Sequence, residues 1–165
     1  MGRLWAEELP QPEEILILGI GNPLIGDDGA GIAAIELLSK CCLPPNVTVQ
    51  EIGTPGWGLG AWFAGRKTII LVDAVQMGQE PGSWRRFELD KIHSPVTQAA
   101  FSLHQSDLAC GISLAQELDL LPEKISLYGI EPADLTPGAS LSPQVAANLP
   151  ALVETIVNDV RRGEI

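Results

Sequence analysis

The sequence predicts an α/β fold, a three-layer sandwich in which a twisted, mostly parallel sheet of about five strands lies between helices. Short apolar runs alternate along the chain with longer segments whose apolar residues have helical spacing, and this alternation is typical of parallel sheets. Two of the runs, ILILGI and TIILVDA, are apolar along nearly their whole length. Such runs are expected of central strands that are covered on both faces.

Five strands are predicted from continuous or alternating apolar runs. The strand at 46–52 alternates between polar and apolar residues, and the one at 83–90 is polar enough to lie at a sheet edge. The last strand is stopped by Pro132. The predicted strands are 15–20, 46–52, 67–75, 83–90 and 124–132.

Four helices are predicted between and after these strands. In the first, Ile32, Ile35 and Leu38 recur at helical spacing. The last begins with Ser142 at the N-cap and Pro143 at the first helical position. The predicted helices are 29–42, a short glycine-containing one at 55–66, 104–120 and 142–163, with a loop at 91–103.

Length, charge and composition limit the class of protein. The 165 residues suit one domain, predicted at 15–165 after a loose arm at 1–14 that contains two prolines. The net charge of −11 repels nucleic acid, and no apolar run reaches the ~18–20 residues of a membrane helix. The three cysteines suit reduced thiols, and the N-terminus lacks the features of a signal peptide. We therefore expect a cytoplasmic protein, a monomer, with neither a nucleic acid nor a membrane as its partner.

Polar residues follow two of the predicted central strands. Asp27 and Asp28 come after the first strand, Asp73 ends the strand at 67–75, and His104 opens a predicted helix. Because functional crevices of parallel sheets lie beyond the carboxyl ends of the strands, the aspartates can share one crevice. Each residue also has a structural interpretation: Asp28 as a helix cap, Asp73 as part of a turn, and His104 as a helix-start residue. His93 is expected to be a solvated loop residue.

A nucleotide site is the first functional interpretation of the glycine-rich turn. Gly19 and Gly21 fit the first two positions of the dinucleotide fingerprint G-x-G-x-x-G, but Leu24 occupies the third. Adjacent carboxylates at a helix entrance also oppose a pyrophosphate. A metal site is the second interpretation, because two carboxylates and an imidazole bind a divalent ion and leave positions open. Spacing alone does not select the metal.

Three motifs of the sequence resemble those of the hydrogenase maturation endopeptidases. GIGNPLIGDDGAG resembles the family signature G-[IV]-G-N-x-L-x-x-D-[DE]-G-x-G. IILVDAV resembles the second motif, an apolar strand that ends in Asp-Ala, and FSLHQSDLACGI resembles the third, a histidine shortly before a helix. Order and spacing agree, and the similarity runs from about residue 15 to 160.

The resemblance implies an endopeptidase that removes a C-terminal extension from a [NiFe] hydrogenase large-subunit precursor after nickel insertion. It implies that Asp28, Asp73 and His104 are the catalytic and metal-binding residues. The expected ion is Ni²⁺, in the first place that of the precursor, and other divalent ions can substitute. Two alternatives stay open from the residues: a metal-dependent hydrogenase assembly chaperone that does not cleave, and an α/β nucleotide-binding module.

The resemblance also implies supporting and substrate-binding residues. Asp27 is expected to support the loop that carries Asp28. The family's Asp-Gly-Gly-Thr turn corresponds to 51–54, where Gly53 and Thr54 match and Glu51 and Ile52 depart. Glu51, Gly53 and Thr54 are the expected substrate-binding residues, and Gly19, Gly21, Asn22 and Asp27 form the expected supporting loop.

The tryptophans have two interpretations. Trp57 and Trp62 lie beside glycines in GWGLGAWF. Such aromatic residues can line a peptide-binding groove. We expect them instead to pack in the core or at a loop base, as large aromatic side chains usually do.

Overall fold

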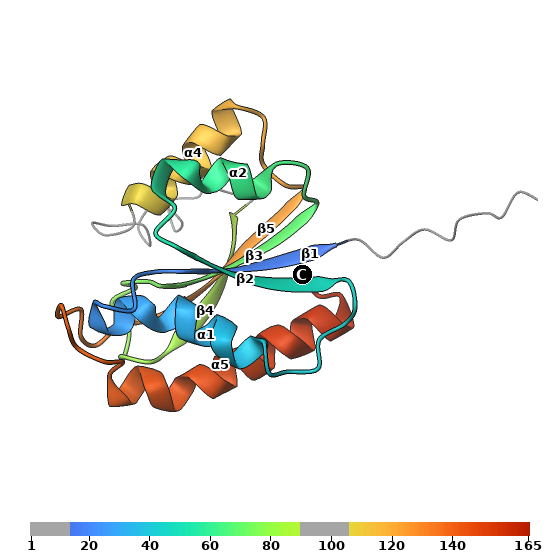
Figure 1. The fold of residues 1–165 in the computed structure, drawn as a ribbon. Helices are drawn as coiled ribbons and strands as arrows, with labels where there is room; N and C mark the ends of the chain where they lie inside the picture. The colour runs from blue at the N-terminus through green and yellow to red at the C-terminus, as the bar shows by residue number, and fades with distance from the viewer. Residues whose placement is uncertain (1–13, 90–105) are drawn as a thin grey trace, which may run out of the picture.

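The computed structural model describes residues 14–89 and 106–165, which form a five-stranded sheet with helices on both faces (Figure 1). The strand order is β2-β1-β3-β5-β4. All neighbouring pairs are parallel except β4 and β5, which are antiparallel. This confirms the predicted α/β class and the edge position of the fourth strand. The strands are β1 (Ile15–Ile20), β2 (Val47–Gly53), β3 (Thr68–Ala74), β4 (Trp84–Glu88) and β5 (Lys124–Ile130).

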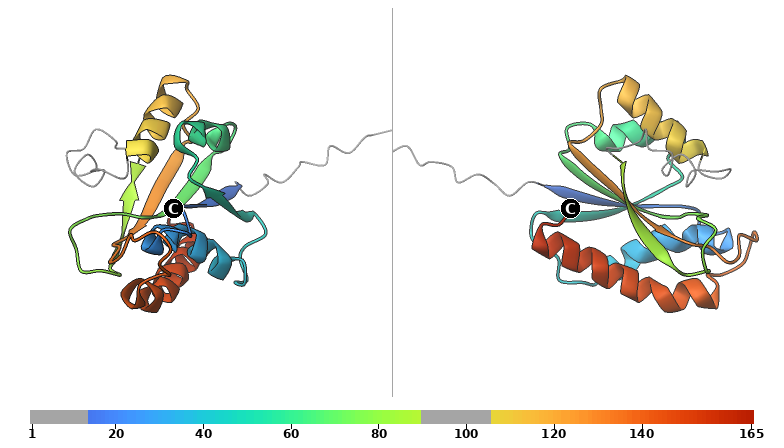
Figure 2. Two further views of the ribbon diagram at one scale, coloured as in Figure 1. Left: turned by 60° about the vertical axis from the view of Figure 1, so that its left-hand side comes forward. Right: turned by 180° about the vertical axis from the view of Figure 1, so that it is seen from behind.

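Two helices cover each face of the sheet. One face carries α1 (Ala30–Leu38) and α5 (Pro143–Arg162), and the other carries α2 (Leu59–Phe63) and α4 (Ser106–Glu117), as Figures 1 and 2 show. Short 3₁₀ helices, η1 (Gly26–Gly29) and η2 (Gly56–Gly58), precede α1 and α2. None of the helices within the described parts of the chain is long and apolar enough to cross a bilayer.

Alternate residues of the central strands build two separate cores. In β1, Ile15 and Ile17 pack toward α1 and α5, whereas Leu16 and Leu18 pack toward α2 and α4. Side chains of a strand alternate between the two faces of the sheet. A strand between two helix layers must therefore be apolar at both its odd and its even positions. This explains why all six residues of β1 are buried.

Three helices are shorter than predicted, and the one expected at 55–66 is divided into η2 and the five residues of α2. The helix expected at 29–42 ends at Leu38, and the hydroxyl of Ser39 donates to the carbonyl oxygen of Glu36. Beyond it, Pro44 and Pro45 prevent continuation. Of the helix expected at 104–120, the described part ends at Glu117, and Asp119 has a φ of 56°. Residues with positive φ do not continue a right-handed helix.

The terminal helix begins as predicted. The Ser142 hydroxyl oxygen accepts a hydrogen bond of 3.3 Å from the Val145 amide, and Pro143 is the first helical residue. Gly163, with a φ of 67°, closes the helix at its C-cap.

Two sequence predictions fall mostly or wholly outside the described residues. They are the arm at 1–14, of which only Glu14 is described, and the loop at 91–103, which contains His93. Glu14 forms an ion pair of 2.6 Å with Arg66.

The topology creates a switch point between β1 and β3. After β1 the chain passes to β2 on one side, and it then crosses to β3 on the other side. The helices that follow β1 and β2, α1 and α2, lie on opposite faces. A crevice opens at the carboxyl ends of strands where the direction of winding changes, so the fold places a site beside the ends of β1 and β3.

Candidate active site

A pocket of about 310 Å³ lies at this switch point. It is formed by the loops after β1 and β2, the end of β3 and the first turn of α4. The carboxyl ends of β1 and β3 point to the left in Figure 1. The pocket therefore brings together chain segments that are far apart in the sequence. Its lining residues are Ile20, Gly21, Asn22, Ile25, Asp28, Thr54, Pro55, Gly56, Asp73, Asp107 and Leu108.

Asp28 lines the pocket and does not cap a helix. The N-cap of α1 is Gly29, which makes no side-chain capping bond. Instead, Oδ2 of Asp28 accepts a hydrogen bond of 2.8 Å from the Asn22 amide. This bond fixes the carboxylate across its own loop, so the structure does not support the helix-cap interpretation.

Asp73 is the buried carboxyl of the pocket, with 7% of its surface exposed. Burial, followed by the nearby charge of Asp28, raises the pKa of Asp73 well above its ordinary value, and a hydrogen bond from the Ala74 backbone opposes this only in part. Both causes disfavour the ionised form. Two carboxyl groups that resist being ionised together favour either a shared proton or a bound cation.

Asp27 points away from the pocket and is fully buried. Its Oδ2 accepts hydrogen bonds from the amides of Ala133 (2.8 Å) and Asp134 (2.9 Å), and its Oδ1 accepts one from Ser142 (2.6 Å). Its own amide donates to the Asp134 carbonyl oxygen at 2.8 Å. The two adjacent aspartates therefore have different roles: Asp28 faces the pocket, and Asp27 binds the loop to the connection between β5 and α5.

Glycines allow this loop to pack closely. Gly21 has a φ of 130°, and a Cβ there would collide with the Asp28 carbonyl oxygen. A Cβ on Gly19 would collide with Ile35 and Gly31 of α1. Any larger residue would displace either the loop or α1, so these glycines are required for the shape of the pocket.

The three expected substrate-binding residues do not lie together. Thr54 lines the pocket, and the Gly53 carbonyl oxygen accepts a 2.9 Å hydrogen bond from the Gly21 amide, which joins the loops after β2 and β1. Glu51 is exposed and lines a separate hollow of about 520 Å³ beside α1, with residues such as Glu36 and Lys40. The register explains the separation, because Glu51 pairs with Gly19, before the strand reaches the pocket.

Asp107 is a pocket residue that sequence reasoning missed. It lies in the first turn of α4 and lines the pocket with Asp28 and Asp73. The only feature of the sequence that points to Asp107 as a site residue is its position three residues after His104. An acidic residue in the first turn of a helix is common for electrostatic reasons alone, so the sequence did not distinguish it.

His104 lies outside the described residues. Within 14–89 and 106–165, no group of three or more His, Cys, Asp or Glu side chains could hold a metal ion. The pocket nevertheless fits part of such a site, since Asp28 and Asp73 carry carboxylate oxygens of the kind that bind divalent cations, and a cation would relieve their mutual repulsion. The described residues thus offer only part of the ligand set that a metal site would need.

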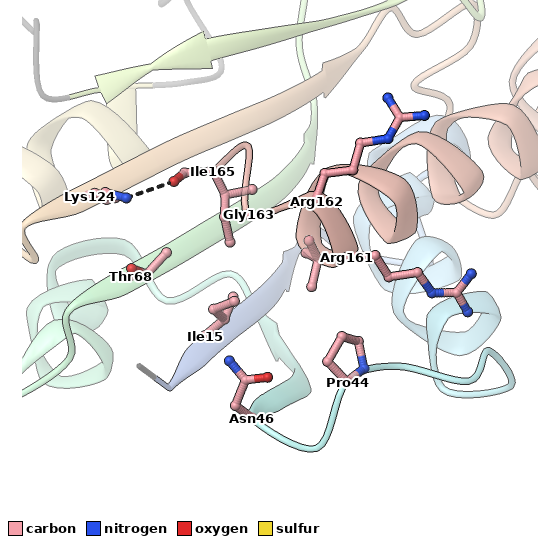
Figure 3. Close-up of a pocket in the computed structure, with 10 residues that line it drawn as sticks. Ile15, Pro44, Asn46, Thr68, Lys124, Arg161, Arg162, Gly163 and Ile165 are labelled. Carbon is pink, nitrogen blue, oxygen red and sulfur yellow. Dashed lines mark hydrogen bonds between the residues drawn. The ribbon is translucent and has the colours of Figure 1, made fainter. Parts of the chain in front are cut away.

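A second pocket, of about 450 Å³, lies at the opposite end of the sheet (Figure 3). Ile15, Thr68 and Lys124, the first residues of three parallel strands, line it. The Lys124 ammonium donates to the carbonyl oxygen of Ile165 at 3.1 Å, and Arg161 donates to the carbonyl oxygen of Cys42 at 2.7 Å. These cations hold the C-terminus and a loop, so the pocket near the strand carboxyl ends is the better candidate.

The family model of hydrogenase maturation proteases matches residues 32–159. The chain belongs to the hydrogenase maturation protease family. The endopeptidase function is that of this family, and the match confirms the family that the sequence motifs suggest.

Individual members of the hydrogenase maturation protease family are similar over most of the chain. A hydrogenase expression/formation protein HupD of Rhizobium leguminosarum bv. viciae is 35% identical over 154 residues, which are 92% of this chain and 76% of that protein. The hydrogenase 2 maturation protease of Escherichia coli K12 is 30% identical over 153 residues, 92% of this chain and 93% of that protein.

The fold of this maturation protease matches a solved one. The hydrogenase maturating endopeptidase HybD from Escherichia coli superposes with a TM-score of 0.77 at 29% identity, over 91% of this chain and 93% of that chain. The five-stranded sheet with helices on both faces is thus the family fold.

Proposed function

We propose that this chain removes a C-terminal extension from the large-subunit precursor of a [NiFe] hydrogenase after nickel has been inserted. The observation that carries the proposal is the pair of facing carboxyl groups, Asp28 and Asp73, at the switch point of a family member. The hydrogenase partner is inferred from the family, and the proposed chemistry is inferred from the residues of the pocket.

Asp28, Asp73 and His104 are proposed to bind the nickel that the precursor already holds. Carboxylate and imidazole groups both ligate divalent first-row ions, so other divalent ions can take the same position. A cation next to Asp28 would also relieve the repulsion that raises the pKa of Asp73. An empty precursor lacks this interaction, so selectivity is a difference in affinity between loaded and empty precursor.

Asp73 is also proposed to hold or move a proton during cleavage. A carboxyl whose pKa is raised by burial keeps a proton at a pH at which ordinary aspartates are ionised. A bound cation would supply polarisation of the scissile carbonyl group or of a water molecule. In this proposal Asp28 is a ligand, and Asp73 releases its proton when the cation binds and then becomes a carboxylate ligand.

The remaining contacts with the precursor are proposed from the family resemblance, together with the positions of these residues in the structure. Gly53 and Thr54 are proposed to position the chain at the pocket. Glu51 is proposed to contact the precursor outside the pocket, at the hollow beside α1. We further propose that the protein acts in the cytoplasm as a monomer, with a hydrogenase precursor as its partner and without nucleic acid or a membrane.

Processing of a nickel-loaded precursor tests the proposal. The intact mass of the precursor is measured before and after incubation with wild type, His104→Ala and His93→Ala. We expect wild type and His93→Ala to release a C-terminal peptide from loaded precursor only, and His104→Ala to release none. Cleavage by His104→Ala would contradict the assignment of that histidine, and stable binding without any cleavage would favour the chaperone alternative.

A further inference from the structure

Two large apolar side chains are exposed beside the acidic pocket. Leu24 is 73% exposed and Trp57 is 66% exposed. Leu24 lies in sequence between two lining residues, Asn22 and Ile25, and Trp57 follows the lining residues Pro55 and Gly56. From the sequence, we expect Trp57 and Trp62 to pack in the core or at a loop base. The exposure of Trp57, and the 37% exposure of Trp62, rule out the core.

The backbones under both side chains are held in place. The Leu24 amide donates to Oδ1 of Asn22 at 3.0 Å, and its carbonyl oxygen accepts from Gly138 at 2.7 Å. Trp57 is in η2, where the Gly58 amide donates to the Pro55 carbonyl oxygen at 2.9 Å. A bond of 2.9 Å between Gly21 and Gly53 joins the two loops. Leu24 and Trp57 are therefore held in solvent by ordered turns. Folding gains no free energy from burying these two apolar side chains.

Charge decides what can cover this surface. The pocket beside it is lined by Asp28, Asp73 and Asp107, and the chain carries a net charge of −11. A second copy docked through the same face would bring like charges together, and an anionic lipid surface would be repelled. A peptide that offers apolar side chains next to a cationic group meets no such penalty.

We propose that Leu24 and Trp57 form an apolar rim that docks the hydrogenase large-subunit precursor beside its scissile bond. Apolar side chains of the precursor pack on the rim, while its cationic group enters the acidic pocket. The inference rests on the proposed function and adds a specificity surface to it. Tryptophan is one of the residue types enriched among those that contribute most to binding energy at interfaces.

Steady-state kinetics on nickel-loaded precursor tests the rim. The variants are Trp57→Ala and Leu24→Ser, and the control is Leu118→Ser, which changes an apolar residue that is 58% exposed beyond α4. We expect KM to rise about tenfold for Trp57→Ala and about threefold for Leu24→Ser, with kcat within about twofold of wild type. Leu118→Ser should change neither constant, and melting curves should show that all three variants are folded.

The outcomes separate the rim from the activity. If wild type processes the precursor but the rim variants have the same KM as Leu118→Ser, the rim does not bind the precursor. The proposed function would then still stand. Failure of wild type to process or bind loaded precursor would overturn both. Sedimentation on the same samples addresses a second copy: a wild-type dimer that Trp57→Ala dissociates, with KM unchanged, would also overturn the proposal.

Discussion

Asp73, the next-to-last residue of β3, is almost out of contact with water and faces a second carboxyl group, Asp28. Its ionised form is disfavoured by burial first and by Asp28 second. Folding therefore gains nothing from this charge at neutral pH. A residue that lowers stability in this way is expected where function requires the charge or the proton.

Asp73→Asn should stabilise the protein and abolish processing. The raised folded pKa means that wild type keeps its full stability below the unfolded pKa of about 3.9 and loses stability as the pH rises toward the folded value. Asparagine has no such loss. Urea unfolding at pH 7 should show a gain of about 1 kcal/mol or more, since one pKa unit is worth about 1.4 kcal/mol. The gain should vanish near pH 4, and a gain equal at both pH values would refute this explanation.

Asp27→Ala should destabilise the protein strongly. The change leaves three backbone amides, those of Ala133, Asp134 and Ser142, without their acceptor. A lost charged acceptor costs about 1–3 kcal/mol, and the buried Ser142 amide has the least access to water, so we expect a total of about 2–4 kcal/mol by urea unfolding. Glu154→Ala, at an exposed position of α5, is the control and should change stability by less than about 0.5 kcal/mol.

Asp107→Asn tests the residue that sequence reasoning missed. Removing the charge of Asp107, one of the three aspartates that line the pocket, should weaken the binding of a cationic substrate without disturbing the fold, because Asp107 is exposed. We expect a several-fold rise in KM at low ionic strength and a smaller one at high salt. An unchanged KM at low salt would show that Asp107 does not contribute to the charge that the substrate meets.

At the scale of elements, the contact of α1 with the sheet positions the site. A Cβ on Gly31 would collide with the carbonyl oxygens of Ile20 in β1 and Val72 in β3. These strands carry the loop of Asp28 and Asp73 itself. The absence of a side chain at one helical residue therefore sets how closely α1 approaches both halves of the pocket.

Gly31→Ala should destabilise the protein, although a change from glycine to alanine inside a helix usually stabilises it. In a free helix, alanine is more favourable than glycine by about 1 kcal/mol. Here the collision should outweigh that gain and destabilise the protein by about 1–3 kcal/mol, the range seen for overpacking. Gly58→Ala is the control, because no atom lies within 4 Å of its Cβ position and its φ is −77°. Thermal melting of both variants measures the difference, and equal melting temperatures would contradict the close-packing argument.

The whole molecule carries 21 acidic and 10 basic residues. Self-repulsion in so acidic a protein opposes the compact state, and salt screens it. The melting temperature at pH 7 should rise by roughly 3 °C between low and moderate NaCl, the shift that about 1 kcal/mol produces at this size. The rise should be the same in KCl and should shrink near the isoelectric point. A rise that depends on the ion would indicate specific binding instead.

The sequence predicts the fold well because burial on both faces forces a simple pattern. The continuous apolar runs of β1 and β3 identify central strands, and an acid at or just after a strand end is readable without a structure, as for Asp28 and Asp73. Helix ends are less predictable, because Leu38 and Glu117 end their helices through local turns. Properties that depend on long-range contacts are hidden: the exposure of Trp57, the pocket position of Asp107 and the separation of Glu51 from the pocket.

The three bonds accepted by Asp27 also set an order of events during synthesis. Its partners Ala133, Asp134 and Ser142 lie more than one hundred residues further along the chain. A chain leaving the ribosome from its N-terminus exposes both pocket carboxylates, Asp28 in η1 and Asp73 in β3, long before these partners emerge. The loop of Asp28 is therefore locked only when the last third of the chain has been translated, so nascent and C-terminally truncated chains have both aspartates but no finished pocket.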